Sequence, residues 1–170
     1  MAGLGLNVVT RGIRYQLSDV EQMSTSDLQS LMETQRDRIV VLDTRSEEEY
    51  RVSHVKGAIR IDPNVRSWRD VCALVPNIED KDKIVAYCSV GYRSSVVVAR
   101  LQRHMQGSDN VPQMFNLEGS LFKWANEERP MVNSHDDPTL YCHPYNAMWG
   151  MMLNSQLRRR EPEAKRTSNI

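Results

Sequence analysis

The chain has 170 residues and a mass of 19.6 kDa, a size that suits one globular domain with short extensions and excludes two full-sized domains. With 40% hydrophobic and 26% charged residues, it has the composition of a folded protein with a single core, not of a disordered chain. Twenty-two basic residues balance twenty-two acidic ones, which argues against nucleic acid or an acidic membrane surface as a partner.

The cysteine content and the N-terminus indicate a compartment. Three cysteines, at positions 72, 88 and 142, are too few for a disulfide framework, and the chain has no Asn-x-Ser/Thr acceptor for glycosylation. No run of eighteen apolar residues exists, and the first ten residues do not resemble a secretory signal. We therefore expect a cytoplasmic protein. Mitochondrial import is the alternative, because the first eighteen residues contain Arg11 and Arg14 but no acid.

Helix and strand patterns alternate in the first half of the chain. Residues 24–32 begin with a capping pattern and continue with apolar residues at helical spacing, which predicts a helix. The run 39–42 is short, β-branched and not alternating, as expected for a strand buried on both faces of a parallel sheet. A second helix is predicted from Ser46, with acids in its first turn, and a third over residues 68–75.

The same alternation continues in the second half. Residues 84–87 and 114–117 predict two further strands, and residues 121–125 lie in a last helix. The segment 94–105 is ambiguous because three consecutive valines favour a strand locally. Its apolar residues recur every fourth position and Gly107 suits a C-terminal cap, so we predict a helix there.

These elements define the expected domain organisation. Strands that alternate with helices predict a three-layer α/β/α domain over residues 18–132. Residues 1–17 are expected to form an N-terminal extension. Residues 133–170 are expected to form a C-terminal extension, with a partly docked aromatic segment followed by a flexible polar tail.

The strongest chemical signal is Cys88, which directly follows a predicted buried strand and precedes a predicted helix. This position puts the cysteine at the carboxyl edge of the sheet, in an open mouth and not in the core. The loop amides and the positive end of the helix then converge on the sulfur and favour the thiolate. Gly91 allows a tight turn of the loop backbone. Arg93 supplies a guanidinium cation that can donate two hydrogen bonds to a sulfonate or carboxylate.

This loop resembles the active-site loop of single-domain rhodanese-like sulfurtransferases over residues 88–94, Cys-Ser-Val-Gly-Tyr-Arg-Ser. Upstream, residues 41–59 are similar to the family's Asp-x-Arg, Glu-Tyr and His-Ile-x-Gly-Ala motifs, and residues 117–130 are similar to its Leu-x-Gly-Gly, Trp and Pro. Two departures are visible, because Ser53 and Ser120 stand where the family usually has glycine. Both are interpreted as structural positions that do not touch the loop chemistry.

The resemblance implies a five-stranded parallel sheet and a sulfurtransferase in which Cys88 carries a sulfane sulfur as a persulfide. Sulfur would come from thiosulfate or from a small or protein-bound persulfide and pass to a thiol or cyanide, without a metal or an organic cofactor. The candidate catalytic residues are Cys88 and Arg93. The candidate substrate-binding residues, with Asp43 expected to hold the loop and Arg45 to assist in the mouth, are Asp43, Arg45, Ser89, Val90, Gly91, Tyr92 and Ser94.

Three alternatives stay open. A phosphatase or arsenate reductase of the same fold places its arginine six positions after the cysteine, whereas Arg93 lies five after Cys88, so this loop is short for a phosphoryl group. The domain could instead be a binding or regulatory module, because fold does not dictate function. Cys142 beside His143 resembles part of a metal site, but no second pair completes zinc spacing.

Overall fold

The computed structural model describes residues 2–108 and 111–165, and its centre is a five-stranded parallel sheet. The strands lie in the order β1-β5-β4-β2-β3. Their bounds are Gln22–Met23 (β1), Ile39–Asp43 (β2), Ile59–Arg60 (β3), Lys83–Tyr87 (β4) and Gln113–Leu117 (β5). The parallel pairing confirms the predicted α/β class and the five-stranded sheet.

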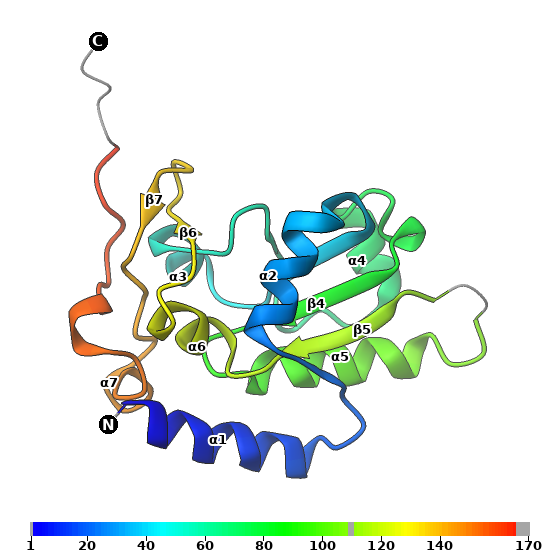
Figure 1. The fold of residues 1–170 in the computed structure, drawn as a ribbon. Coiled ribbons are helices and arrows are strands. Elements are labelled where there is room, and N and C mark those ends of the chain that lie inside the picture. The colour runs from blue at the N-terminus through cyan, green and yellow to red at the C-terminus, as the bar shows by residue number, and fades with distance from the viewer. Residues whose placement is uncertain (1, 109–110, 166–170) are drawn as a thin grey trace.

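Helices cover both faces of the sheet, and Figure 1 shows α2 and α5 on opposite sides of it. The helices of the central domain are Thr25–Thr34 (α2), Glu47–Val52 (α3), Trp68–Leu74 (α4), Tyr92–His104 (α5) and Ser120–Asn126 (α6). Short 3-10 turns lie at Arg36–Arg38, Ile78–Asp80 and Ser155–Leu157. The three-layer arrangement is therefore the predicted one.

The two central strands are apolar on both faces because each face has its own core. Val41 and Val85 pack in one cluster with Leu28 of α2, whereas Val40 and Ile84 pack in a second cluster with residues of α4 and α5. Successive strand residues point to opposite faces, so a strand buried on both sides needs an unbroken apolar run. This explains why the strands at 39–43 and 83–87 could be predicted from their composition.

Local signals for helix starts also proved correct. Ser24 Oγ accepts a hydrogen bond from the backbone N–H of Asp27 at 3.1 Å at the start of α2. Ser46 and Glu49 form a reciprocal capping box at the start of α3. The three valines lie within α5, where Val97 and Val98 are buried in the core. Tertiary burial thus outweighs their local strand preference.

The N-terminal extension is a helix, α1 (Ala2–Gln16), which the sequence did not predict. Its buried residues Leu6 and Ile13 belong to the same apolar cluster as residues of α6 and of the C-terminal segment. Among the described residues, no helix is long and apolar enough to cross a membrane.

The C-terminal segment, residues 133–165, packs along the domain. It contains the strand β7 (Pro138–Thr139), which pairs antiparallel with β6 (Met131–Val132), and the helix α7 (Ala147–Gly150). Cys142, Leu153 and Leu157 anchor the segment in the apolar cluster. The boundaries at residues 17 and 132 and the flexible tail stay predictions, and residues 166–170 lie outside the described part of the chain.

Candidate active site

The loop between β4 and α5 surrounds the sulfur of Cys88. Gly91 adopts φ 110°, in the left-handed region that favours glycine, and it caps the start of α5. Its backbone N–H points back and donates a hydrogen bond to Cys88 Sγ at 3.2 Å. A donor aimed at sulfur from a helix N-terminus stabilises negative charge there. The geometry therefore suits a nucleophilic thiolate.

The N-terminus of α6 holds the base of this loop. Ser120 Oγ accepts a hydrogen bond from the Cys88 N–H at 3.2 Å, while the Leu121 and Phe122 N–H groups donate to the carbonyls of Cys88 and Ser89 at 3.0 Å. Ser120 lies at φ 50°, where a glycine is the easier residue. Ser120 is thus a structural position, as interpreted from the sequence, and it directly contacts the backbone of Cys88. Ser53 is extended at φ −166° and has no need of glycine.

Cys88 itself is buried, with 1% of its surface exposed. The expectation of an open mouth is therefore wrong for this conformation. In the same loop, Arg93 binds the Ser89 hydroxyl and lies against the ring of Tyr145 from the C-terminal segment.

Arg93 is bound by a carboxylate of the protein and not left free for an anionic substrate. Its Nη1 and Nη2 donate to the two carboxylate oxygens of Glu49 at 2.9 and 2.8 Å, and Nη2 also donates to Ser89 Oγ at 2.9 Å. Ser89 Oγ in turn donates to Glu49 Oε1 at 2.7 Å. This closed network joins the loop to α3, so Arg93 positions the loop in this conformation.

Glu49 is a functional residue that the sequence did not single out. Burial alone would raise its pKa, but the hydrogen bond from Arg93 and the charges of Arg45 and Arg93 lower the pKa to about 2. The carboxylate is thus ionised at neutral pH and binds Arg93 through two hydrogen bonds. The sequence placed Glu49 in a helical first turn and in the family's Glu-Tyr motif but gave it no role at the site, because its contact with Arg93 spans 44 residues.

Asp43 and Arg45 form a second ion pair, which is fully buried. Arg45 Nη2 lies 2.6 Å from Asp43 Oδ2, and neither side chain is exposed. Arg45 Nη2 also donates to the carbonyl of Ser53 at 2.6 Å. Asp43 binds Arg45 and not the loop, and Arg45 does not lie in the mouth. The structure therefore contradicts both expected roles and makes the pair part of the scaffold at the end of β2.

The remaining predicted binding residues divide into two groups. Ser94 is buried, and its Oγ donates to Asn116 Oδ1 at 2.6 Å, so it fixes the first turn of α5 to β5. Val90 is also buried. Tyr92, by contrast, is 45% exposed and is the predicted binding residue best placed to meet a substrate at the rim of the loop.

The C-terminal segment contributes a residue to this site. The ring of Tyr145 lies 4.7 Å from Arg93 Cζ, a cation–π distance. Cys142 is fully buried nearby, and burial raises the pKa of its thiol to about 12. Among the described residues, no group of three or more His, Cys, Asp or Glu side chains could hold a metal ion.

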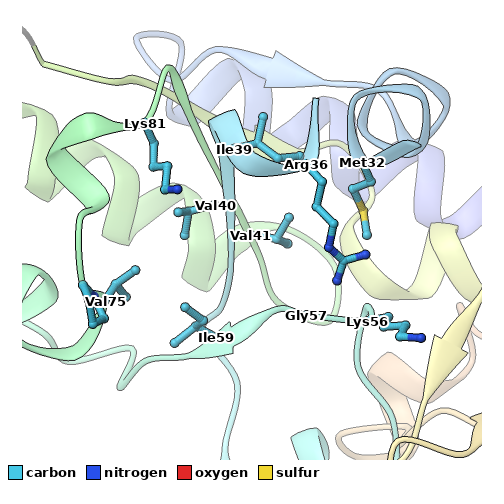
Figure 2. Close-up of a pocket in the computed structure, with 11 residues that line it drawn as sticks. Met32, Arg36, Ile39, Val40, Val41, Lys56, Gly57, Ile59, Val75 and Lys81 are labelled. Atoms are coloured by element: carbon cyan, nitrogen blue, oxygen red, sulfur yellow. The ribbon is translucent and has the colours of Figure 1, made fainter. Parts of the chain in front are cut away.

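A cavity of about 240 Å³ lies elsewhere in the domain, near the start of β2 (Figure 2). Ile39, Val40 and Val41 line it together with Arg36 and Lys81. Because Cys88 follows the carboxyl end of the neighbouring strand β4, this cavity is not part of the Cys88 site.

The comparisons with known proteins agree with this fold. A rhodanese-like domain model matches residues 24–127. The tRNA uridine(34) hydroxylase of Streptococcus uberis is 39% identical over 118 residues, which cover 59% of this chain and 35% of that protein. The enzyme of the same name from Agrobacterium fabrum is 32% identical over 91 residues, covering 52% and 27%. The chain thus spans about a third of these relatives.

Among solved structures, the thiosulfate sulfurtransferase of Pseudomonas aeruginosa superposes with a TM-score of 0.55 at 15% identity, covering 75% of this chain and 23% of that one. The protein BH2092 of Bacillus halodurans gives a TM-score of 0.52 at 20% identity, covering 75% and 86%. These likenesses concern the fold. Because the family model covers more than half of the sequence, the chain belongs to the rhodanese-like domain family.

Proposed function

We propose that the chain is a sulfurtransferase in which Cys88 carries the sulfur in transit. The observation that supports this most directly is the hydrogen bond from the Gly91 N–H to Cys88 Sγ at 3.2 Å. A thiolate in that position is stabilised by a backbone donor and by the N-terminus of the thirteen-residue helix α5. The same donors can stabilise the outer sulfur of a persulfide, which is also anionic.

The reaction is a double displacement. The Cys88 thiolate attacks the sulfane sulfur of the donor, a new S–S bond forms, and sulfite or a thiolate leaves with the electron pair of the broken bond. A thiol or cyanide then attacks the outer sulfur of the persulfide, and Cys88 leaves as a thiolate. Both steps move sulfur between nucleophiles, so they need no metal or organic cofactor.

We propose a small sulfur donor, or a persulfide borne by another protein, as the partner. A free Cys88 thiol is compatible with the cytoplasm, where thiols stay reduced. We do not carry over the tRNA activity named for the relatives, because the chain spans only 27% and 35% of those proteins. The balance of 22 basic and 22 acidic residues also offers no general attraction for a polyanion.

A phosphatase is the weaker candidate. Its transition state needs a cation and a wide ring of donors around the phosphoryl group. Here the cation of the loop, Arg93, is bound by Glu49, and the loop has one residue fewer between cysteine and arginine. A purely binding module is also less favoured, because such a role does not require a donor aimed at a cysteine sulfur.

The test is a steady-state assay with thiosulfate and with low-mass persulfides as donors, run on the wild type and on Cys88→Ala. Circular dichroism is used to check that the variant is folded. We expect sulfur transfer with at least one donor in the wild type and none in the variant. Equal transfer in both proteins, or none with any donor in the wild type, contradicts the proposal.

A further inference from the structure

The C-terminal segment lies beside the active-site loop although it is outside the region matched by the family model. Figure 1 shows it running past the end of the sheet toward which β5 points. Cys142, Leu153 and Leu157, all buried, fix it on either side of Tyr145. The position of Tyr145 at the site is therefore set by a packed segment.

The backbone of Tyr145 is held in an uncommon conformation. Its φ is 63°, in the left-handed region, which is unfavourable for a bulky side chain. The Tyr145 N–H donates to His143 Nδ1 at 3.0 Å. Burial lowers the pKa of His143, so this ring is neutral and can accept the hydrogen bond. Backbone strain of this kind is often found where a side chain must be presented at a functional site.

Tyr145 completes the enclosure of Arg93. Glu49 and Ser89 bind the guanidinium nitrogens, and the Tyr145 ring lies 4.7 Å from the guanidinium carbon. The other side of the ring reaches solvent, because Tyr145 is 44% exposed. Cys88 is close enough to Arg93 for their charges to interact, and it is 1% exposed. An anionic reagent that approaches this loop therefore meets a cation that is already paired with Glu49 and only partly exposed, at 24% of its side chain.

We propose that Tyr145 is a specificity-determining residue of the Cys88 site, because its ring holds Arg93 in the Glu49 ion pair and so slows small anionic reagents. Once the ring is removed, Arg93 can leave the pair and attract an anion toward the sulfur. The identity of this anion in the cell, a sulfur donor such as thiosulfate, rests on the proposed function. Access to Cys88 itself can be measured without any sulfur transfer.

The test compares the alkylation of Cys88 by anionic iodoacetate and by neutral iodoacetamide in the full-length chain. In both reactions the cysteine thiolate displaces iodide and forms a thioether, which is mapped to each cysteine by peptide mass spectrometry. The informative variant is Tyr145→Gly, which removes the ring and suits the left-handed backbone. We expect iodoacetate to react with its Cys88 about tenfold faster than with the wild type, and iodoacetamide to gain less.

The chain supplies its own controls. Cys72 is partly exposed and is not part of the C-terminal segment, so its alkylation rate should not change. Cys142 is buried in that segment, so its alkylation reports any detachment of the segment. Tyr145→Phe keeps an aromatic face on Arg93 and should restore slow alkylation. Tyr141→Ala removes a similar contact, with Arg159 at 5.0 Å in the same segment, and should leave Cys88 as in the wild type.

The proposal is overturned if the rates of Cys88 alkylation by iodoacetate and by iodoacetamide rise equally in Tyr145→Gly, or if neither rate changes. It is also overturned if Cys142 becomes reactive together with Cys88. The last result would mean that the ring only holds the segment in place. If the expected alkylation pattern appears but neither the wild type nor Tyr145→Gly transfers sulfur, the proposed function fails while the role of Tyr145 stands.

Discussion

The domain contains two buried arginine–carboxylate pairs that differ in their access to solvent. In the pair of Arg45 and Asp43 both side chains have 0% exposure, whereas Arg93 and Glu49 have 24% and 2%. The first pair lies at the end of β2, where Arg45 donates hydrogen bonds to Asp43 and to the carbonyl of Ser53. The second joins that loop to α3 and borders Tyr145.

The difference in solvent exposure indicates different roles for the two ion pairs. A fully buried charge has no water to replace a lost partner, so the Arg45 pair is a fixed part of the scaffold, from which the charge of Arg45 also helps to keep Glu49 ionised. Arg93 keeps one side near solvent, so an approaching anion can meet its guanidinium. Both pairs join an arginine to a carboxylate. Their different burial determines whether the arginine can meet an incoming anion.

The largest effect is expected from breaking the scaffold pair. Arg45→Met leaves the Asp43 carboxylate buried without its cation, which should lower the free energy of unfolding by about 3–5 kcal/mol. Urea denaturation measures this. The matched control is Arg60→Met, because Arg60 and Glu47 form an ion pair with 33% and 62% exposure. The control should lose less than about 1 kcal/mol. Similar losses in both variants would contradict the comparison.

A pH titration of stability tests the pair at the active site. The pKa of Glu49 is about 2 in the folded protein against an ordinary value of 4.5, so its stabilisation is complete above pH 4.5 and is lost as the pH falls toward 2. The difference corresponds to about 3 kcal/mol. Unfolding curves of the wild type and Glu49→Gln between these pH values should therefore converge. Parallel curves would show that Glu49 is not held ionised by Arg93.

Removing the cation of the same pair should have a smaller effect than Arg45→Met. In Arg93→Met the Glu49 carboxylate keeps the Ser46 N–H and the Ser89 hydroxyl as donors, so we expect a loss of about 1–2 kcal/mol in unfolding free energy. Arg93→Lys, which cannot bind both oxygens with a fork, should lie between this variant and the wild type. A loss as large as that of Arg45→Met would remove the distinction between the two pairs.

The smallest effect is expected at Ser89, whose hydroxyl links both members of the pair. Ser89→Ala should lower the free energy of unfolding by about 1 kcal/mol, because the direct Arg93–Glu49 contacts remain. Thermal denaturation at neutral pH measures this. A loss above that of Arg93→Met would mean that the hydroxyl, not the arginine, holds the loop on α3.

Local patterns predicted the fold and the loop that holds Cys88 but not the network around that loop. Strands, helix caps and the loop with Cys88 and Gly91 depend on neighbouring residues, and the structure has them where the sequence indicated. Glu49 and Tyr145 reach Arg93 from positions 44 and 52 residues away, so no spacing in the sequence could reveal them.

Tertiary contacts also explain two further features that the sequence did not predict, the helix α1 and the contact of Ser120. The helix α1 contains Gly3, Gly5 and Gly12, which weaken helix propensity, and it is stabilised by burying Leu6 and Ile13 against the rest of the molecule. Ser120 was known as a departure from the family pattern, but only the tertiary structure reveals that its hydroxyl binds the backbone of Cys88.

The central claim, that Cys88 carries sulfur, is tested most directly by weighing the protein after a brief reaction with a sulfur donor and removal of the excess. The account predicts a gain of one sulfur atom, located on the peptide of Cys88, which disappears when cyanide is added and never forms in Cys88→Ser. An unchanged mass with every donor, or a gain that persists in Cys88→Ser, would contradict it.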